Sequence, residues 1–166
     1  MKINTTGSRA LAVSAALLAF TNFANAQDVT GISTVDVDVE LSDMDKGNAL
    51  TFWPSIQGDL QASIVKAAEP VFNNDGYQVT VRLTDVSLSG STVLTDKGEF
   101  NHMEGWVFYR KPGEPEPVYE QKIILDAATE TVGGTSSYVI LPDLPEFYQS
   151  LIGAFADSTV AIAEGL

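Results

Sequence analysis

Valine and acidic residues alternate in the segment VDVDVEL, residues 35–41, and this pattern restricts the possible folds more than any other feature of the chain. Successive side chains of a β-strand point to opposite faces of the sheet. The apolar positions 35, 37, 39 and 41 would therefore face a core, while the acids between them would face water. The segment predicts a half-buried strand, followed by a turn over residues 43–48.

Two longer segments have the three- and four-residue apolar spacing of an amphipathic helix. The first covers residues 51–69, where Thr51 can cap the helix and Pro54 falls in its first turn. The second covers residues 143–163 and begins with Asp143 and Glu146, a spacing that resembles a capping box. The second helix has a continuous polar face, so it is not expected to cross a membrane.

Alternating or aromatic-rich segments predict three further strands, over residues 77–84, 100–110 and 118–126. A short fifth strand is expected at residues 138–141, after a polar, glycine-bearing loop over 127–137. Hairpin-length connections indicate that the strands after the first helix are antiparallel. We therefore predict an α+β two-layer sandwich, in which two amphipathic helices pack on one face of a four- to five-stranded, mainly antiparallel sheet in the order β-α-β-β-β-(β)-α.

Residues 1–26 have the pattern of a secretory signal peptide. Lys2 and Arg9 supply positive charge, residues 11–20 are apolar, and Ala24 and Ala26 occupy the positions that a signal peptidase reads. The apolar run is shorter than the roughly 20 residues that a membrane-spanning helix needs. We expect cleavage after Ala26, a single domain over residues 27–166, and a periplasmic or secreted location.

The chain has no cysteine and a formal net charge of −13. Without cysteine it can form no disulfide, thiol nucleophile, zinc–thiolate site or lipidated cysteine anchor. Loss of Lys2 and Arg9 with the signal peptide would change the net charge to −15. Such a charge opposes binding to nucleic acid and to anionic membrane surfaces. We expect no cofactor, no nucleic-acid partner and no direct membrane anchor after cleavage.

The acids of residues 35–45 do not fit a calcium-binding loop. An EF-hand loop needs glycine at its sixth position and glutamate at its twelfth. A loop that starts at Asp36 has Leu41 at the sixth position, and one that starts at Asp43 has Pro54 at the twelfth. Alternate residues of a strand are also about 6–7 Å apart. We therefore expect a solvated strand face without a metal ion, and a weak calcium-binding module remains an alternative.

His102 is the only histidine and the one candidate for an imidazole base. Glu104 shares its strand face and Glu99 is near, but no Gly-x-Ser-x-Gly motif offers a nucleophile. A metal site with two or three histidines is impossible. We predict no catalytic residues, and a small hydrolase that uses carboxylates remains an alternative.

The predicted strand over residues 100–110 carries large apolar side chains on the face away from the helices. If the neighbouring strands run without irregularity, that face carries five candidate binding residues: Trp106, Phe108, Val86, Leu88 and Ile124. Exposed apolar patches commonly mark contacts. A bulge near Asp85 would instead turn the residues at 86 and 88 inward, and the loop over 127–137 could cover the tryptophan. Our leading hypothesis is an exported, non-catalytic protein that binds an envelope protein or an apolar ligand through this face.

The predicted order of elements resembles that of small envelope lipoproteins in which two helices pack on a four-stranded sheet. Examples are the lipopolysaccharide-assembly accessory lipoproteins and the transport-auxiliary lipoproteins. The resemblance extends over residues 27–166 but includes no shared motif. Those proteins carry a lipidated N-terminal cysteine, which this chain lacks, so the resemblance concerns the fold pattern and implies no function.

Overall fold

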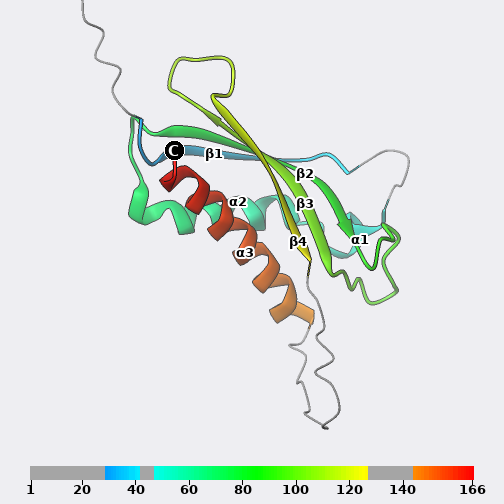
Figure 1. Ribbon diagram of the computed structural model, residues 1–166. Helices are drawn as coiled ribbons and strands as arrows, with labels where there is room; N and C mark the ends of the chain where they lie inside the picture. The colour runs from blue at the N-terminus through cyan, green and yellow to red at the C-terminus, as the bar shows by residue number, and fades with distance from the viewer. Residues whose placement is uncertain (1–28, 42–46, 127–143) are drawn as a thin grey trace, which may run out of the picture.

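The computed structural model describes residues 29–41, 47–126 and 144–166, which form a four-stranded sheet with helices on one of its faces (Figure 1). The chain forms, in order, β1 (Ile32–Val39), α1 (Ala49–Phe52), α2 (Ile56–Ala68), the 3₁₀ helix η2 (Glu69–Val71), β2 (Tyr77–Ser87), β3 (His102–Arg110), β4 (Tyr119–Asp126) and α3 (Leu144–Glu164). The predicted α+β class, with two main helices packed against the sheet, is confirmed. The expected fifth strand at residues 138–141 lies outside the described residues.

The strands lie side by side in sequence order, β1-β2-β3-β4. β1 and β2 are parallel, because α2 lies between them in the chain and returns it to the same end of the sheet. β2, β3 and β4 are successive antiparallel strands, as predicted, although the connection between β2 and β3, residues 88–101, is longer than a hairpin loop. The sheet is therefore mixed, with its one parallel pair at the β1 side.

The first helix differs from the prediction, because it is divided in two by Pro54. α1 ends at Phe52, and α2 begins at Ile56 after Trp53 has taken a non-helical conformation, with φ −123° and ψ 62°. A residue that precedes proline is disfavoured in the helical region, because its backbone collides with the proline ring. The predicted cap is also wrong: α1 begins at Ala49, so Thr51 lies within it, and Ser55 stands at the N-cap of α2.

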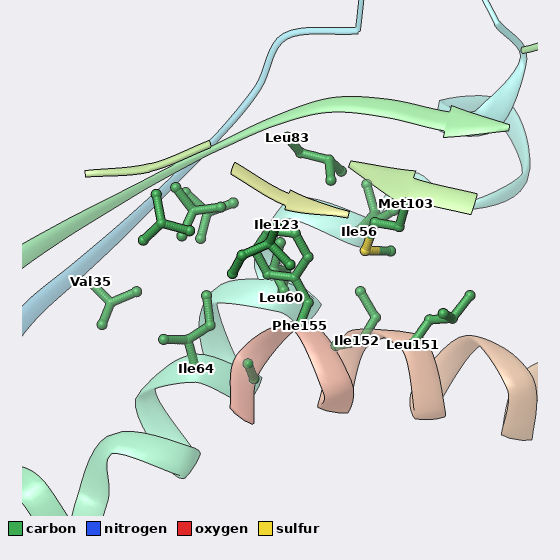
Figure 2. Close-up of a cluster of buried hydrophobic side chains, with 14 of the residues drawn as sticks. Val35, Ile56, Leu60, Ile64, Leu83, Met103, Ile123, Leu151, Ile152 and Phe155 are labelled. Carbon is green, nitrogen blue, oxygen red and sulfur yellow. The ribbon is translucent and has the colours of Figure 1, made fainter. Parts of the chain in front are cut away.

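The core lies between the sheet and the pair α2 and α3 (Figure 2). Both helices turn apolar stripes toward the strands, and their central residues have essentially no exposed surface. Leu60 and Ile64 come from α2, and Ile152 and Phe155 come from α3. From the sheet, alternate residues point into the same layer, as their half-buried pattern predicts. These include Val35, Val37, Val79, Val81, Leu83, Met103, Val107, Tyr109 and Ile123.

Two tyrosines fix the helices to the rest of the core. The hydroxyl of Tyr109 donates a hydrogen bond to the carbonyl oxygen of Thr159 on α3, at 2.7 Å. The hydroxyl of Tyr148 donates to a carboxylate oxygen of Asp59 on α2, also at 2.7 Å. Burial is the main cause that raises the pKa of each hydroxyl far above its ordinary value of 10.0. Both phenols therefore stay protonated and serve as structural donors.

The outer edge of β1 is protected by α2. The side-chain amide of Gln57 donates to the carbonyl oxygen of Val37 at 2.8 Å, and that of Gln61 donates to Val35 at 2.9 Å. These two bonds use backbone acceptors that an edge strand would otherwise present to solvent or to another chain.

Candidate functional site

Strand β3 carries the centre of the helix-free face. Its side chains alternate without interruption between buried and partly exposed positions, and Trp106 and Phe108 belong to the partly exposed set. Both are therefore on the face predicted for them, and each remains partly buried by its neighbours on β2 and β4. We call Trp106 and Phe108, which occupy alternate positions of β3, the aromatic pair.

Cationic side chains from the flanking strands lie over both rings of the aromatic pair. Arg82 of β2 lies opposite Trp106 in register, and its guanidinium carbon is 5.3 Å from the centre of the Phe108 ring. Lys122 of β4 also lies opposite Trp106, and its Nζ is 5.8 Å from the centre of that ring. Each contact of this kind contributes roughly 0.5–1 kcal/mol at an exposed site. The methylene stems of the two cations can also cover part of the aromatic surface.

The same cations form ion pairs on this face. Nε of Arg82 lies 3.2 Å from Glu40, and Nζ of Lys122 lies 2.6 Å from Glu104. The acids Asp36, Asp38 and Glu120 have no such partner among the described residues, and all three are exposed. The helix-free face therefore combines two shielded rings with unpaired negative charge toward both of its edges.

Val86 does not lie on this face: its placement as a binding residue, which required strands without irregularity, is wrong, and the alternative of a bulge near Asp85 is confirmed. The pairing of β2 with β3 shifts register between Leu83 and Asp85, and the extra residue turns Val86 toward the core, where only 2% of its surface is exposed. Leu88 is partly buried and packs against the same core. Ile124 is 52% exposed and lies diagonally across from Trp106 on the helix-free face. Of the five predicted binding residues, the structure thus brings together Trp106, Phe108 and Ile124.

His102 lies at the end of β3, beside an open depression of about 310 Å³. Its Nδ1 is 2.6 Å from Oδ1 of Asp126, which lies opposite in the β3–β4 register. Its Nε2 is 3.5 Å from Oδ2 of Asp85, at the bulge of β2. The sequence analysis named Glu104 and Glu99 as the acids near His102. Asp85 and Asp126 come from the two neighbouring strands, so their place beside His102 follows from the pairing of the strands and not from local spacing.

The arrangement around His102 does not assemble a nucleophile with a base. The hydroxyl of Ser87 donates to Oδ2 of Asp85 at 3.0 Å and not to the imidazole. Asp126 contacts Nδ1 and Asp85 contacts Nε2, so the imidazole ring lies between the two carboxylates. A metal ion bound to either nitrogen would therefore have only one of the two aspartates beside it. Within the described part of the chain, no group of three histidine, aspartate or glutamate side chains is placed to hold a metal ion.

The fold and the helix-free face define a two-layer α+β protein in which one face of the sheet carries no helix of the described residues. The chain matches no protein-family model, no curated protein and no solved structure. Among the helices that the structure describes, none combines the length and apolar character needed to cross a membrane.

Proposed function

We propose that this chain is an exported, non-catalytic protein that binds a protein partner through its helix-free sheet face. The observation that carries this proposal is the aromatic pair, Trp106 and Phe108, partly exposed at the centre of that face beside the 52% exposed Ile124. Tryptophan and other large side chains near the centre of a contact commonly contribute most of the binding free energy. Export is supported by the signal-peptide pattern of residues 1–26.

A protein surface fits this face better than a small apolar ligand does. Apolar ligands bind in concave pockets that enclose most of their surface, whereas here two rings alternate with charged side chains on a sheet. The depression beside His102 is not lined by Trp106 or Phe108. The unpaired acids Asp36, Asp38 and Glu120 favour a partner that carries lysine or arginine where it meets this face.

The alternative of a small hydrolase that uses carboxylates has weaker support, because Asp85 and Asp126, the carboxylates beside the depression, contact different ring nitrogens of His102. His102 is oriented by Asp126, as a catalytic imidazole would be, but the nearby Ser87 hydroxyl is bonded to Asp85. Acids of β1 alternate along an exposed strand face, an arrangement that gives little support to a calcium module.

Site-specific photo-crosslinking in the native cell tests the proposal. A photoreactive amino acid in place of Ile124 should capture a partner from the cell envelope. The same amino acid in place of Val93, which is 66% exposed in the β2–β3 connection, should not capture that partner. Raised salt should weaken the capture at Ile124, because the acids of the face attract a basic partner.

A second substitution in the photoreactive chain establishes the role of the aromatic pair. Trp106→Ala should lower partner affinity roughly thirtyfold, the effect of losing one strong contact residue. Phe72→Ala is the matched control, because Phe72 is a 61% exposed aromatic beside β1, away from β3 and β4. Absence of capture at Ile124, or capture that survives Trp106→Ala unchanged, would refute the proposal.

A further inference from the structure

Two similar groups of side chains surround the aromatic pair, one on each side of β3. Each group consists of one ring of the pair, a cation from the neighbouring strand and an acid that pairs with that cation. On the β2 side the guanidinium of Arg82 lies 5.3 Å from the centre of the Phe108 ring and pairs with Glu40. A guanidinium suits this place, because it is planar and weakly hydrated, and it can stack on a ring while it bonds to a carboxylate.

On the β4 side a lysine fills the corresponding place. Nζ of Lys122 is 5.8 Å from the centre of the Trp106 ring and 2.6 Å from Oε1 of Glu104. A cation–π contact extends to about 6 Å, so the ammonium lies close to that limit. Tryptophan is the ring that attracts cations most strongly, whereas an ammonium is a compact, strongly hydrated point charge. The stronger ring therefore holds the less suitable cation.

We propose that an arginine of the partner replaces Lys122 over Trp106 and bonds to Glu104. This proposal rests on the proposed function, and it names the side chain by which the partner is recognised. A carboxylate accepts two parallel N–H bonds from a guanidinium, whereas an ammonium meets it as a point charge. Exchange of one cation for another also keeps the partly buried carboxylate paired, which avoids the cost of an unpaired acid. Lys122 thus pairs with Glu104 in the free protein and competes with the partner for the same site.

Glu104 is held in position for such a contact. Its side chain is 21% exposed, and the side chain of Lys122 that pairs with it is 36% exposed. The hydroxyl of Thr84 lies 3.2 Å from the backbone carbonyl oxygen of Glu104 and 3.3 Å from its Oε1, within hydrogen-bond distance of both. Because Glu104 and Trp106 are alternate residues of β3, they lie on one face, about 6–7 Å apart along the strand. One arginine can therefore contact the ring and the carboxylate together, as Arg82 does in the first group.

NMR titration of the purified protein with a capped hexa-arginine peptide tests the proposal. The chain has two tryptophans, and the indole N–H signal that Trp106→Phe removes belongs to Trp106. In the parent protein that signal should shift as hexa-arginine binds. Capped hexalysine carries the same charge and should bind roughly tenfold more weakly, because it offers the site only the kind of cation that Lys122 already supplies.

Removal of the competing lysine should strengthen binding. Lys122→Gln should tighten the binding of hexa-arginine about tenfold, because the protein's own cation no longer occupies the site. Lys97→Gln is the matched control: it makes the same change in net charge at an exposed position of the β2–β3 connection, and it should change the affinity less than about twofold. Glu104→Gln should weaken binding about tenfold. Glu114→Gln, which removes an exposed acid from the β3–β4 connection, should not.

Equal strengthening by Lys122→Gln and Lys97→Gln would mean that net charge alone sets the affinity, and it would overturn the proposal. A Trp106 signal that stays in place as hexa-arginine is added would do the same. The crosslinking experiment can fail independently of this one. Capture at Ile124 without a response of Trp106 to hexa-arginine leaves the proposed function standing and overturns the arginine contact. A response of Trp106 without capture at Ile124 supports the arginine contact and counts against the proposed function.

Discussion

Gly105→Ala should destabilise the protein, because β3 and α3 approach each other closely at this residue. A Cβ atom at position 105 would lie 2.9 Å from the carbonyl oxygen of Arg82 and 3.0 Å from Cζ of Phe155. Phe155 has no exposed surface and cannot move aside without disturbing the core. Overpacking of a core typically costs about 1–3 kcal/mol. We expect the free energy of unfolding to fall by about that amount.

Gly153→Ala is the matched control, the same substitution in the interior of α3. A Cβ at Gly153 meets no atom within 4 Å, and alanine is favoured over glycine in a helix by roughly 0.5–1 kcal/mol. This variant should therefore be more stable than the parent. Urea denaturation followed by circular dichroism measures both changes in the free energy of unfolding. If the slope of that free energy against urea concentration is the same as in the parent, both variants unfold as the parent does.

A double-mutant cycle identifies the cause of the Gly105 effect. In a Phe155→Leu background the ring atom is gone, so the cost of Gly105→Ala should become smaller, although the Arg82 carbonyl oxygen keeps it above zero. If Gly105→Ala is neutral or stabilising while Gly153→Ala behaves as expected, β3 and α3 are not in close contact at this position and our description of the packing fails.

Two further predictions concern the aromatic pair and the buried tyrosines. Leu60→Ala should cost about 2–5 kcal/mol of unfolding free energy, because Leu60 is fully buried. Trp106→Ala should cost only about 1–2 kcal/mol, since its ring is partly exposed, and equal losses in urea titrations would mean that Trp106 belongs to the core. The raised pKa of Tyr109 means that above about pH 10 the unfolded chain releases a proton that the folded chain keeps, so stability should fall as pH rises from there. Tyr109→Phe removes the hydrogen bond to Thr159 but should reduce this decline, when the free energy of unfolding is measured from pH 8 to pH 11. If that free energy falls with pH as steeply as in the parent, Tyr109 is not the cause of the decline.

Local periodicity was enough to predict the layers of this protein. The alternation around Val37 and along β3 depends only on the geometry of a strand, which turns successive side chains to opposite faces. The apolar stripes of the two helices follow from 3.6 residues per turn in the same way. Where the strands and helices are regular, the sequence therefore indicated which side is buried, including the partly exposed side of Trp106 and Phe108.

The tertiary structure decided how the strands align, and the alignment decided the site. A one-residue irregularity between Leu83 and Asp85 buries Val86, which the alternation alone would place on the open face. The partners of His102 come from the bulge of one strand and the end of another, so no local spacing could reveal them. The cations over the aromatic rings also depend on cross-strand register. Register is a property of pairs of strands distant in sequence, and for that reason the chain's local pattern predicted the faces of the sheet but not the neighbours on them.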